Sequence, residues 1–226
     1  MNHSARRINS LAKQLGARRY LEVGVSAGAT FRDVEIAERT GVDPNFLFDT
    51  NTLANEFTRL VRSTSDEFFV TEPLFPPYDV IFIDGLHKFE QVVRDLSNAL
   101  IRTHRHSVII LDDTIAGDVY SAIPDQEAAL RYRRAAGIGS SAWNGDVFKT
   151  VFYIHDFWPS LNYRTIGGSP QTLVWRGNGM RRPPLFDDLE RISRLTYFDL
   201  QENYGVLQLA TEEEAIALCA AEVNIL

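Results

Sequence analysis

Cysteine is nearly absent from this sequence of 226 residues, since Cys219 is the only one and no disulfide can form within the chain. A chain without disulfides suits a reducing compartment. The sequence also lacks an apolar run of the roughly 20 residues that cross a bilayer, and its N-terminus lacks the apolar core of a signal peptide. We therefore expect a cytoplasmic protein with no membrane partner.

Basic residues are not in excess either, because 23 Lys and Arg residues stand against 30 Asp and Glu residues and the formal net charge is −7. Nucleic-acid-binding domains usually carry a basic surface, so we expect no nucleic-acid partner. The small basic clusters at 131–134 and 181–182 are more typical of a solvated surface than of an anion-binding loop. With 45% hydrophobic residues, the chain is long enough for one globular domain with a sizeable core.

Short apolar segments of β character alternate with helical patterns in the first half of the chain. Strands are expected at 20–25, 40–42, 58–62, 78–84 and 107–113, and amphipathic helices at 4–16 and 88–101. The strands at 78–84 and 107–113 are almost continuously apolar, as in central parallel strands that are covered on both faces. This order predicts an α/β fold with a Rossmann-like, doubly wound, mostly parallel sheet.

The second half departs from this alternation. Residues 114–150 contain several glycines and a helical pattern at 126–136, and an excursion of this length after a buried strand is typical of a lid or substrate loop. An apolar stretch at 147–154 follows. Two short strands at 163–166 and 171–175, around a Gly-Gly-Ser-Pro turn, predict a C-terminal antiparallel hairpin.

We expect residues 1–178 to form one domain. Residues 179–226, with helical patterns near 186–201 and 211–221, are expected to form an appendage rather than an independent domain. This appendage could pack on its own sheet or on a second copy of the chain, so a homo-oligomer remains open.

A glycine turn follows the first expected strand, where Tyr20–Gly28 reads YLEVGVSAG. Gly24 and Gly28 would allow a ligand to approach the backbone closely. Glu22 places a carboxylate at the carboxyl end of the strand, which is where open α/β sheets bind ligands. Asp43 ends the next strand, where an acid binds the ribose hydroxyls of a nucleoside-type cofactor.

This turn admits other interpretations. It could be a tight turn without any ligand, and its spacing differs from the Gly-x-Gly-x-x-Gly fingerprint of dinucleotide-binding proteins. The turn also fits the Gly-x-Ser-x-Gly motif of serine hydrolases, with Ser26 as the nucleophile. We reject that interpretation, because too few residues precede Ser26 to supply the strands that carry an oxyanion loop.

Three aspartates, Asp84, Asp112 and Asp113, end the two most apolar strands and should meet at the carboxyl edge of the sheet. Clustered carboxylates repel one another unless a cation or a proton is present, and oxygen ligands suit Mg²⁺ or Ca²⁺. We therefore expect a divalent metal site formed by the three aspartates, although helix capping and turn formation would also explain them. His87 could take a proton from a substrate hydroxyl bound there.

Six segments taken together resemble the class I S-adenosylmethionine-dependent methyltransferases. They are Tyr20–Gly28, Gly41–Pro44, Ser65–Phe69, Ile83–His87, Leu111–Thr114 and Gly145–Lys149, and the resemblance extends over residues 8–176. Within that class, the sequence is similar to small-molecule methyltransferase-domain proteins with an Ile-Asp-Gly-x-His motif, which are related to the catechol and sugar O-methyltransferases.

The resemblance implies S-adenosylmethionine as the cofactor, with Mg²⁺ as an additional one if the metal site forms. The implied cofactor-binding residues are Glu22, Gly24, Ser26, Gly28, Asp43, Asp66, Phe68 and Asp84. Asp66 would contact the adenine amino group, with Phe68 beside the ring. Asp84 and His87 would be catalytic and face the methyl-transfer centre, although the related enzymes often have lysine in place of His87.

The reaction implied is O-methylation of a small polar acceptor, such as a sugar or natural-product hydroxyl, and N-methylation stays open. The loop 114–150, with Trp143 and Lys149, would close over the acceptor. One departure from the family is that Gly28 and Asp43 are close in sequence, so the first crossover helix is expected to be short or replaced. An oxidoreductase that binds NAD on the same sheet, and a non-catalytic protein that keeps the fold, are the alternatives.

Overall fold

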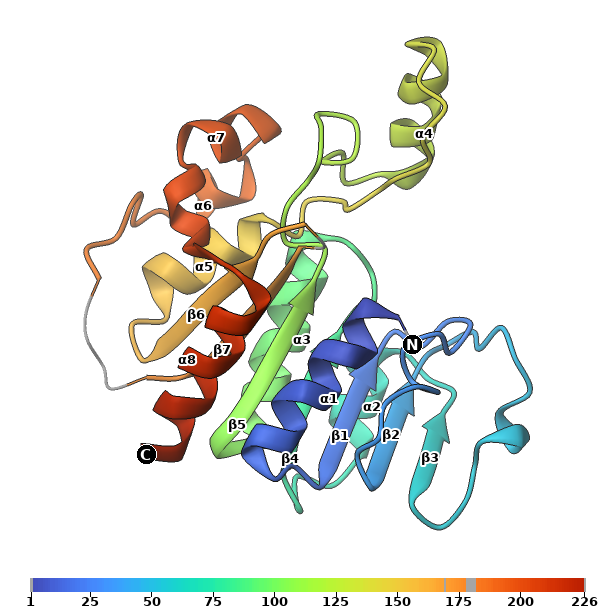
Figure 1. The fold of residues 1–226 in the computed structure, drawn as a ribbon. Coiled ribbons are helices and arrows are strands. Elements are labelled where there is room, and N and C mark those ends of the chain that lie inside the picture. The colour runs from blue at the N-terminus through green and yellow to red at the C-terminus, as the bar shows by residue number, and fades with distance from the viewer. Residues whose placement is uncertain (1, 169, 178–181, 226) are drawn as a thin grey trace.

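A computed structural model of the chain describes residues 2–168, 170–177 and 182–225 (Figure 1). Ser169 in the expected hairpin turn, Arg181 in one basic cluster and the expected domain boundary at 178–179 lie outside the described residues. One eight-stranded sheet runs through the molecule in the order β3-β2-β1-β4-β5-β7-β6-β8. Within the described part of the chain, no helix is both long and apolar enough to cross a membrane.

The sheet is parallel over its first five strands and antiparallel at the hairpin. The parallel strands are β1 (Arg19–Val23), β2 (Glu38–Val42), β3 (Thr58–Val61), β4 (Tyr78–Ile83) and β5 (Thr103–Asp112). The antiparallel strand β7 (Gln171–Arg176) lies between β5 and β6 (Leu161–Ile166), and β8 (Leu209–Ala210) is parallel to β6. This mixed arrangement confirms the expected Rossmann-like α/β sheet with an antiparallel hairpin. The two-residue β8 was not predicted.

Helices cover both faces of the sheet, because successive strand residues point to opposite sides and both sides are apolar. On one face, α1 (His3–Leu15) and α8 (Glu212–Ile225) lie side by side over Tyr20, Phe82 and Trp175 (Figure 1). On the other face, α2 (Ser65–Thr71), α3 (Phe89–Ile101) and α5 (Lys149–Phe157) bury residues such as Leu21, Ile83 and Leu111. The core is therefore two apolar layers separated by the sheet.

No helix connects β1 to β2. Residues 24–37, all of them described, form turns, and Phe31, Val34 and Ile36 of this segment are buried on the same face of the sheet as α1. The guanidinium of Arg39 donates hydrogen bonds to the carbonyls of Phe31 and Val34 at 3.1 and 2.8 Å and so holds the segment in place. The expectation that the first crossover helix is short or replaced is confirmed.

The long excursion after β5 leaves the body of the protein, carries α4 (Gln126–Ala135) at its tip and returns before α5 (Figure 1). It has a small interior of its own, where the buried Arg133 pairs with Asp118 at 2.7 Å. The stretch expected to be helical at 186–201 forms two short helices, α6 (Leu189–Ser193) and α7 (Tyr197–Glu202). Two 3-10 helices, η1 (Thr50–Thr52) and η2 (Tyr204–Leu207), complete the described elements.

Candidate active site

Two adjoining cavities open at the carboxyl ends of the parallel strands. The first has a volume of about 450 Å³, and its polar lining residues are Ser26, Asp43, Thr64, Ser65, Asp66, Asp84 and Gln91. The second, of about 330 Å³, shares Gly24, Ser26, Asp84 and Gly85 with the first and continues to Glu22, Thr30 and His87. Residues from the ends of β1, β2 and β4 therefore meet in one place, as expected at the ligand-binding edge of an open α/β sheet.

Gly24 allows the turn after β1 to touch the end of β4. Its φ is +90°, and a Cβ atom there would lie 2.0 Å from the carbonyl oxygen of Asp84. Gly28 has a φ of +76°, and its Cβ would lie 2.9 Å from the Phe48 ring. Both glycines are required by the packing of the chain against itself. This requirement holds whether or not a ligand approaches their backbone.

Asp43 braces the glycine turn from the neighbouring strand. Its carboxylate accepts hydrogen bonds from the backbone amides of Ser26 and Asn45, each at 2.7 Å. Ser26 has a left-handed φ of +49°, which a residue other than glycine adopts only when its surroundings hold it. Asp43 therefore shapes the cavity wall in addition to lining it.

Asp66 lies at the start of α2 in a network that includes three residues the sequence did not single out. The side-chain amide of Gln91 donates to Asp66 at 3.2 Å and to the buried Asp95 at 3.1 Å. Arg94 donates to the second oxygen of Asp66 at 2.6 Å. Burial raises the pKa of Asp95 to about 6, against the opposing effect of the hydrogen bonds from Ser65 and Gln91. An Asp four residues after Gln91 on the buried side of a helix is the sequence feature that could have revealed the contact between Gln91 and Asp95.

Phe68 does not line either cavity, contrary to the expectation that it lies beside the adenine ring. Its side chain is 1% exposed and packs in the core against Phe69, with ring centroids 5.4 Å apart. The Arg102 guanidinium lies 5.6 Å from the Phe68 ring. Phe68 follows the cavity-lining Asp66 by two residues, roughly half a helical turn, so its side chain points to the opposite side of α2, toward the sheet.

Glu22 is buried at the wall of the second cavity. The Tyr20 hydroxyl, two residues earlier on the same side of β1, donates to the Glu22 carboxylate at 2.6 Å. Burial raises the pKa of Glu22 well above its usual range, and this hydrogen bond opposes the rise. The N-terminus of α1 lies close to this cavity, because Asn2 donates to Thr30 at 2.9 Å.

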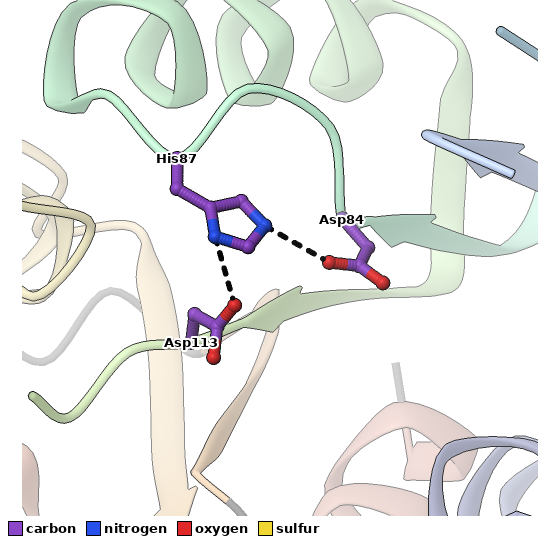
Figure 2. Close-up of side chains that lie close together, drawn as sticks. All are labelled: Asp84, His87 and Asp113. Carbon is purple, nitrogen blue, oxygen red and sulfur yellow. Dashed lines mark hydrogen bonds and ion pairs between the residues drawn. The ribbon is translucent and has the colours of Figure 1, made fainter. Parts of the chain in front are cut away.

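His87 lies between two carboxylates (Figure 2). Its Nε2 is 3.3 Å from Asp84 Oδ1, and its Nδ1 is 3.1 Å from Asp113 Oδ2. Burial alone would lower the pKa of His87, but the hydrogen bond to Asp84 and the charge of Asp113 outweigh burial and raise it. Burial also raises the pKa of Asp84, and the hydrogen bond with His87 opposes this rise. The two acids thus favour the imidazolium form of His87.

The metal-ligand set that the structure brings together differs from the expected three aspartates. Ligand atoms of Asp84, His87 and Asp113 all lie within 4.8 Å of one another, and Asp112 is not part of this group. Asp113 has a left-handed φ of +56°, which directs it away from its neighbour, and the Asp112 carboxylate accepts the Asp113 amide at 2.9 Å. Burial, followed by the charges of Asp84 and Asp113, raises the pKa of Asp112 to about 8.

Lys149 does not face the site, contrary to the expected role in a lid over the acceptor. Its buried ammonium donates to Asp146 at 2.8 Å and to the Ser193 carbonyl at 2.7 Å. Trp143 does reach the site, because its ring stacks on His87 with centroids 5.1 Å apart and an interplanar angle of 19°. The returning end of the excursion therefore contributes an aromatic ring to the site, while its lysine helps to anchor α5.

Comparison with known proteins agrees with this architecture. Residues 3–114, about half of the chain, match a family model described as a methyltransferase domain. These residues form a methyltransferase domain. Comparison with curated protein sequences found no match.

Solved methyltransferase structures share the fold at low sequence identity. Cofactor-bound Rv0187 from MTB is 18% identical with a TM-score of 0.51, covering 76% of this chain and 78% of that chain. An O-methyltransferase from Bacillus cereus in complex with SAH is 15% identical with a TM-score of 0.50, covering 78% and 82%. MycE methyltransferase from the mycinamycin biosynthetic pathway, in complex with Mg and SAH, is 13% identical with a TM-score of 0.50, covering 78% of this chain but 49% of MycE.

Proposed function

We propose that this protein is a class I methyltransferase that uses S-adenosylmethionine to methylate a hydroxyl of a small polar acceptor. The observation that carries the proposal is the pair of adjoining cavities, with strand-end acids along one side and His87 at the far end. The B. cereus O-methyltransferase and MycE, which share the fold, were both solved with SAH. The acceptor class, a sugar or natural-product hydroxyl, follows from the resemblance to the sugar O-methyltransferases.

In this proposal the first cavity holds the nucleoside and the second holds the amino-acid part of the cofactor. Asp43 is available to the ribose hydroxyls, and Asp66 with Gln91 to the base. Glu22 and Ser26 line the cavity that would hold the amino-acid part. Asp84 lines both cavities, so the sulfur and its methyl group would lie near it, within reach of His87.

His87 is proposed as the base that takes the acceptor proton at Nε2. Because the pKa of His87 is raised, only its neutral form, which gains population as the pH rises, can act in this way. The cofactor supplies a methyl group bonded to a positively charged sulfur, which is a good leaving group. As the acceptor oxygen bonds to the methyl carbon, the carbon–sulfur bond breaks and its electron pair passes to sulfur. The charge of Asp113, whose Oδ2 is 3.1 Å from Nδ1, would stabilise the imidazolium that forms. Holding the reacting atoms in line supplies much of the remaining rate acceleration.

We also propose that the group Asp84, His87 and Asp113 can hold a divalent cation. Two carboxylate oxygens and one imidazole nitrogen suit Mn²⁺ or Zn²⁺ as well as Mg²⁺, which prefers oxygen ligands alone. A cation bound there would polarise the acceptor hydroxyl and lower its pKa. His87 would then be a ligand, so base and ligand are alternative roles for this residue.

Calorimetric titration with S-adenosylhomocysteine tests the proposal, first without metal and then with Mg²⁺ and with Mn²⁺. Micromolar binding would support the cofactor site, and a change in affinity with either ion would support the cation site. Absence of binding under all three conditions would overturn the proposal. Fluorescence quenching on addition of NADH would then favour an oxidoreductase. If S-adenosylhomocysteine does bind but no turnover occurs with a panel of phenols and sugars, a non-catalytic protein is favoured instead.

A further inference from the structure

Four consecutive residues at the returning end of the excursion contact the site: two lie against His87, one bonds to Asp113, and one bonds to the start of α3. The Trp143 ring stacks on the His87 ring, and the Asn144 side chain donates to Asp113 Oδ1 at 2.5 Å. Asp146 Oδ1 accepts the backbone amide of Phe89, at the start of α3, at 2.8 Å. The His87 imidazole and the Asp113 carboxylate are therefore both held from outside the sheet by one short segment.

Gly145 makes the closest of these contacts. Its φ is +60°, and a Cβ atom there would lie 1.7 Å from the His87 carbonyl oxygen. No side chain fits between the two backbones, so the segment 143–146 touches the His87 loop directly. Lys149 pairs with Asp146 at 2.8 Å in a buried setting and connects the segment to α5.

We propose that residues 143–146 form a latch whose closure positions His87 between Asp84 and Asp113. The indole face fixes the plane of the imidazole, because aromatic rings stacked in this way have a preferred separation and tilt. Asn144 fixes the carboxylate of Asp113 at the same time. Trp143 and Asn144 are thus positioning residues for the methyl transfer proposed above, on which this inference rests.

The latch also couples the excursion to catalysis. Because α4 and its flanking segments stand away from the body (Figure 1), their movement would be transmitted to His87 through Trp143 and Asn144. An acceptor that draws the excursion down would complete the catalytic group, whereas an open excursion would leave the imidazole free to rotate. Water would reach the site only in the open form. Because His87 is out of position in that form, transfer of the methyl group to water would be slow.

Chemical labelling of histidines with diethylpyrocarbonate, read by mass spectrometry, tests the latch without the acceptor. We expect Trp143→Ala to speed labelling of His87 by roughly three- to tenfold, the range of an aromatic contact, and Asn144→Ala to speed it less. Trp143→Phe should restore most of the protection, because a phenyl ring still covers the imidazole. The matched control is Phe57→Ala, an exposed aromatic residue just before β3 that lies outside the excursion.

His155 is an internal reference, since its Nδ1 lies 2.9 Å from the Tyr163 hydroxyl and it makes none of these contacts. Unchanged His87 labelling in Trp143→Ala, with His155 labelling and thermal unfolding also unchanged, would overturn the latch. If Trp143→Ala does not fold, the other two variants decide. The latch then requires His87 to be labelled slowly in Trp143→Phe and faster than in the wild type in Asn144→Ala. Titration of each variant with S-adenosylhomocysteine separates the two proposals, because a wild-type protein that binds none refutes the cofactor site and leaves the labelling result to judge the latch.

Discussion

The two sides of the carboxyl edge are built in different ways. The cofactor side is built within the sheet and the helices that cover it: the turn after β1 is braced by Asp43 from the next strand, and Gln91 holds Asp66 from a neighbouring helix. The catalytic side joins distant parts of the chain, since His87 lies between Asp84 and Asp113 and under Trp143. The cofactor side should therefore tolerate changes in the catalytic side, whereas the catalytic side depends on the excursion.

Removing the His87 side chain should give the largest effect and the sharpest separation of the two sides. We expect His87→Ala to lower turnover by roughly 10²- to 10⁴-fold, the usual contribution of a general base, with S-adenosylhomocysteine affinity nearly unchanged. Turnover would be followed as S-adenosylhomocysteine release with acceptors found in a panel of phenols and sugars. Equal losses of turnover and affinity would show that His87 is structural and would erase the distinction between the sides.

Gly24→Ala should break the cofactor side itself. The new Cβ would collide with the Asp84 carbonyl at a left-handed φ, so we expect a loss of at least about 2 kcal/mol in the free energy of unfolding and at least about tenfold in cofactor affinity. Urea unfolding and calorimetry measure the two losses. Gly117→Ala is the matched control, because nothing lies within 4 Å of a Cβ at Gly117. A Gly24→Ala protein as stable as this control would contradict the packing argument.

Asp95→Asn should stabilise the protein at neutral pH. The pKa of Asp95 is about 6 in the folded protein and near 4 in the unfolded chain, so the folded state binds the proton more tightly and loses stability as pH rises from 4 to above 6. The cost at pH 7 is about 3 kcal/mol, from roughly 2 pKa units at 1.36 kcal/mol each. Urea unfolding at pH 4 and pH 7.5 checks this result. The free energies of unfolding of Asp95→Asn and of the wild type should differ at pH 7.5 and converge at pH 4.

Tyr20→Phe should have the smallest effect of the four. It removes the hydrogen bond to the buried Glu22 and leaves one carboxylate oxygen without that donor, at a cost of about 1–2 kcal/mol in the free energy of unfolding. Tyr132→Phe, on the exposed α4, serves as the control and should cost almost nothing. Equal stability of Tyr20→Phe and the wild type would mean that Glu22 finds another partner.

Much of the fold and of the cofactor side could be predicted from the sequence, because both depend on local patterns. The buried runs at 78–84 and 107–113 place their terminal acids at one edge of a parallel sheet. The short distance from Gly28 to Asp43 left no room for a full crossover helix, as the structure has it. The proposed roles of these residues in binding remain predictions.

The parts that sequence reasoning missed depend on backbone geometry and on long-range contacts. The left-handed φ of Asp113 separates it from Asp112, and no pattern in the sequence indicates which of two adjacent acids turns toward His87. Phe68 was assigned by its position in a motif, while the phase of α2 directs it into the core. Trp143 was expected in the loop over the acceptor, but its contact with His87 was not predicted, because only the folded excursion brings the two distant rings together.

The loop that replaces the first crossover helix has a consequence for hydrogen exchange. Without a regular helical ladder, the backbone amides of residues 24–37 bond to scattered acceptors, such as the Val42 and Gly28 carbonyls. This wall of the cavities should therefore open locally at a free energy well below that of β4 in the centre of the sheet. Cofactor release would then require only a local opening and no movement of the sheet. The amides of 24–37 should exchange early in the free protein and slow markedly when the cavities are filled.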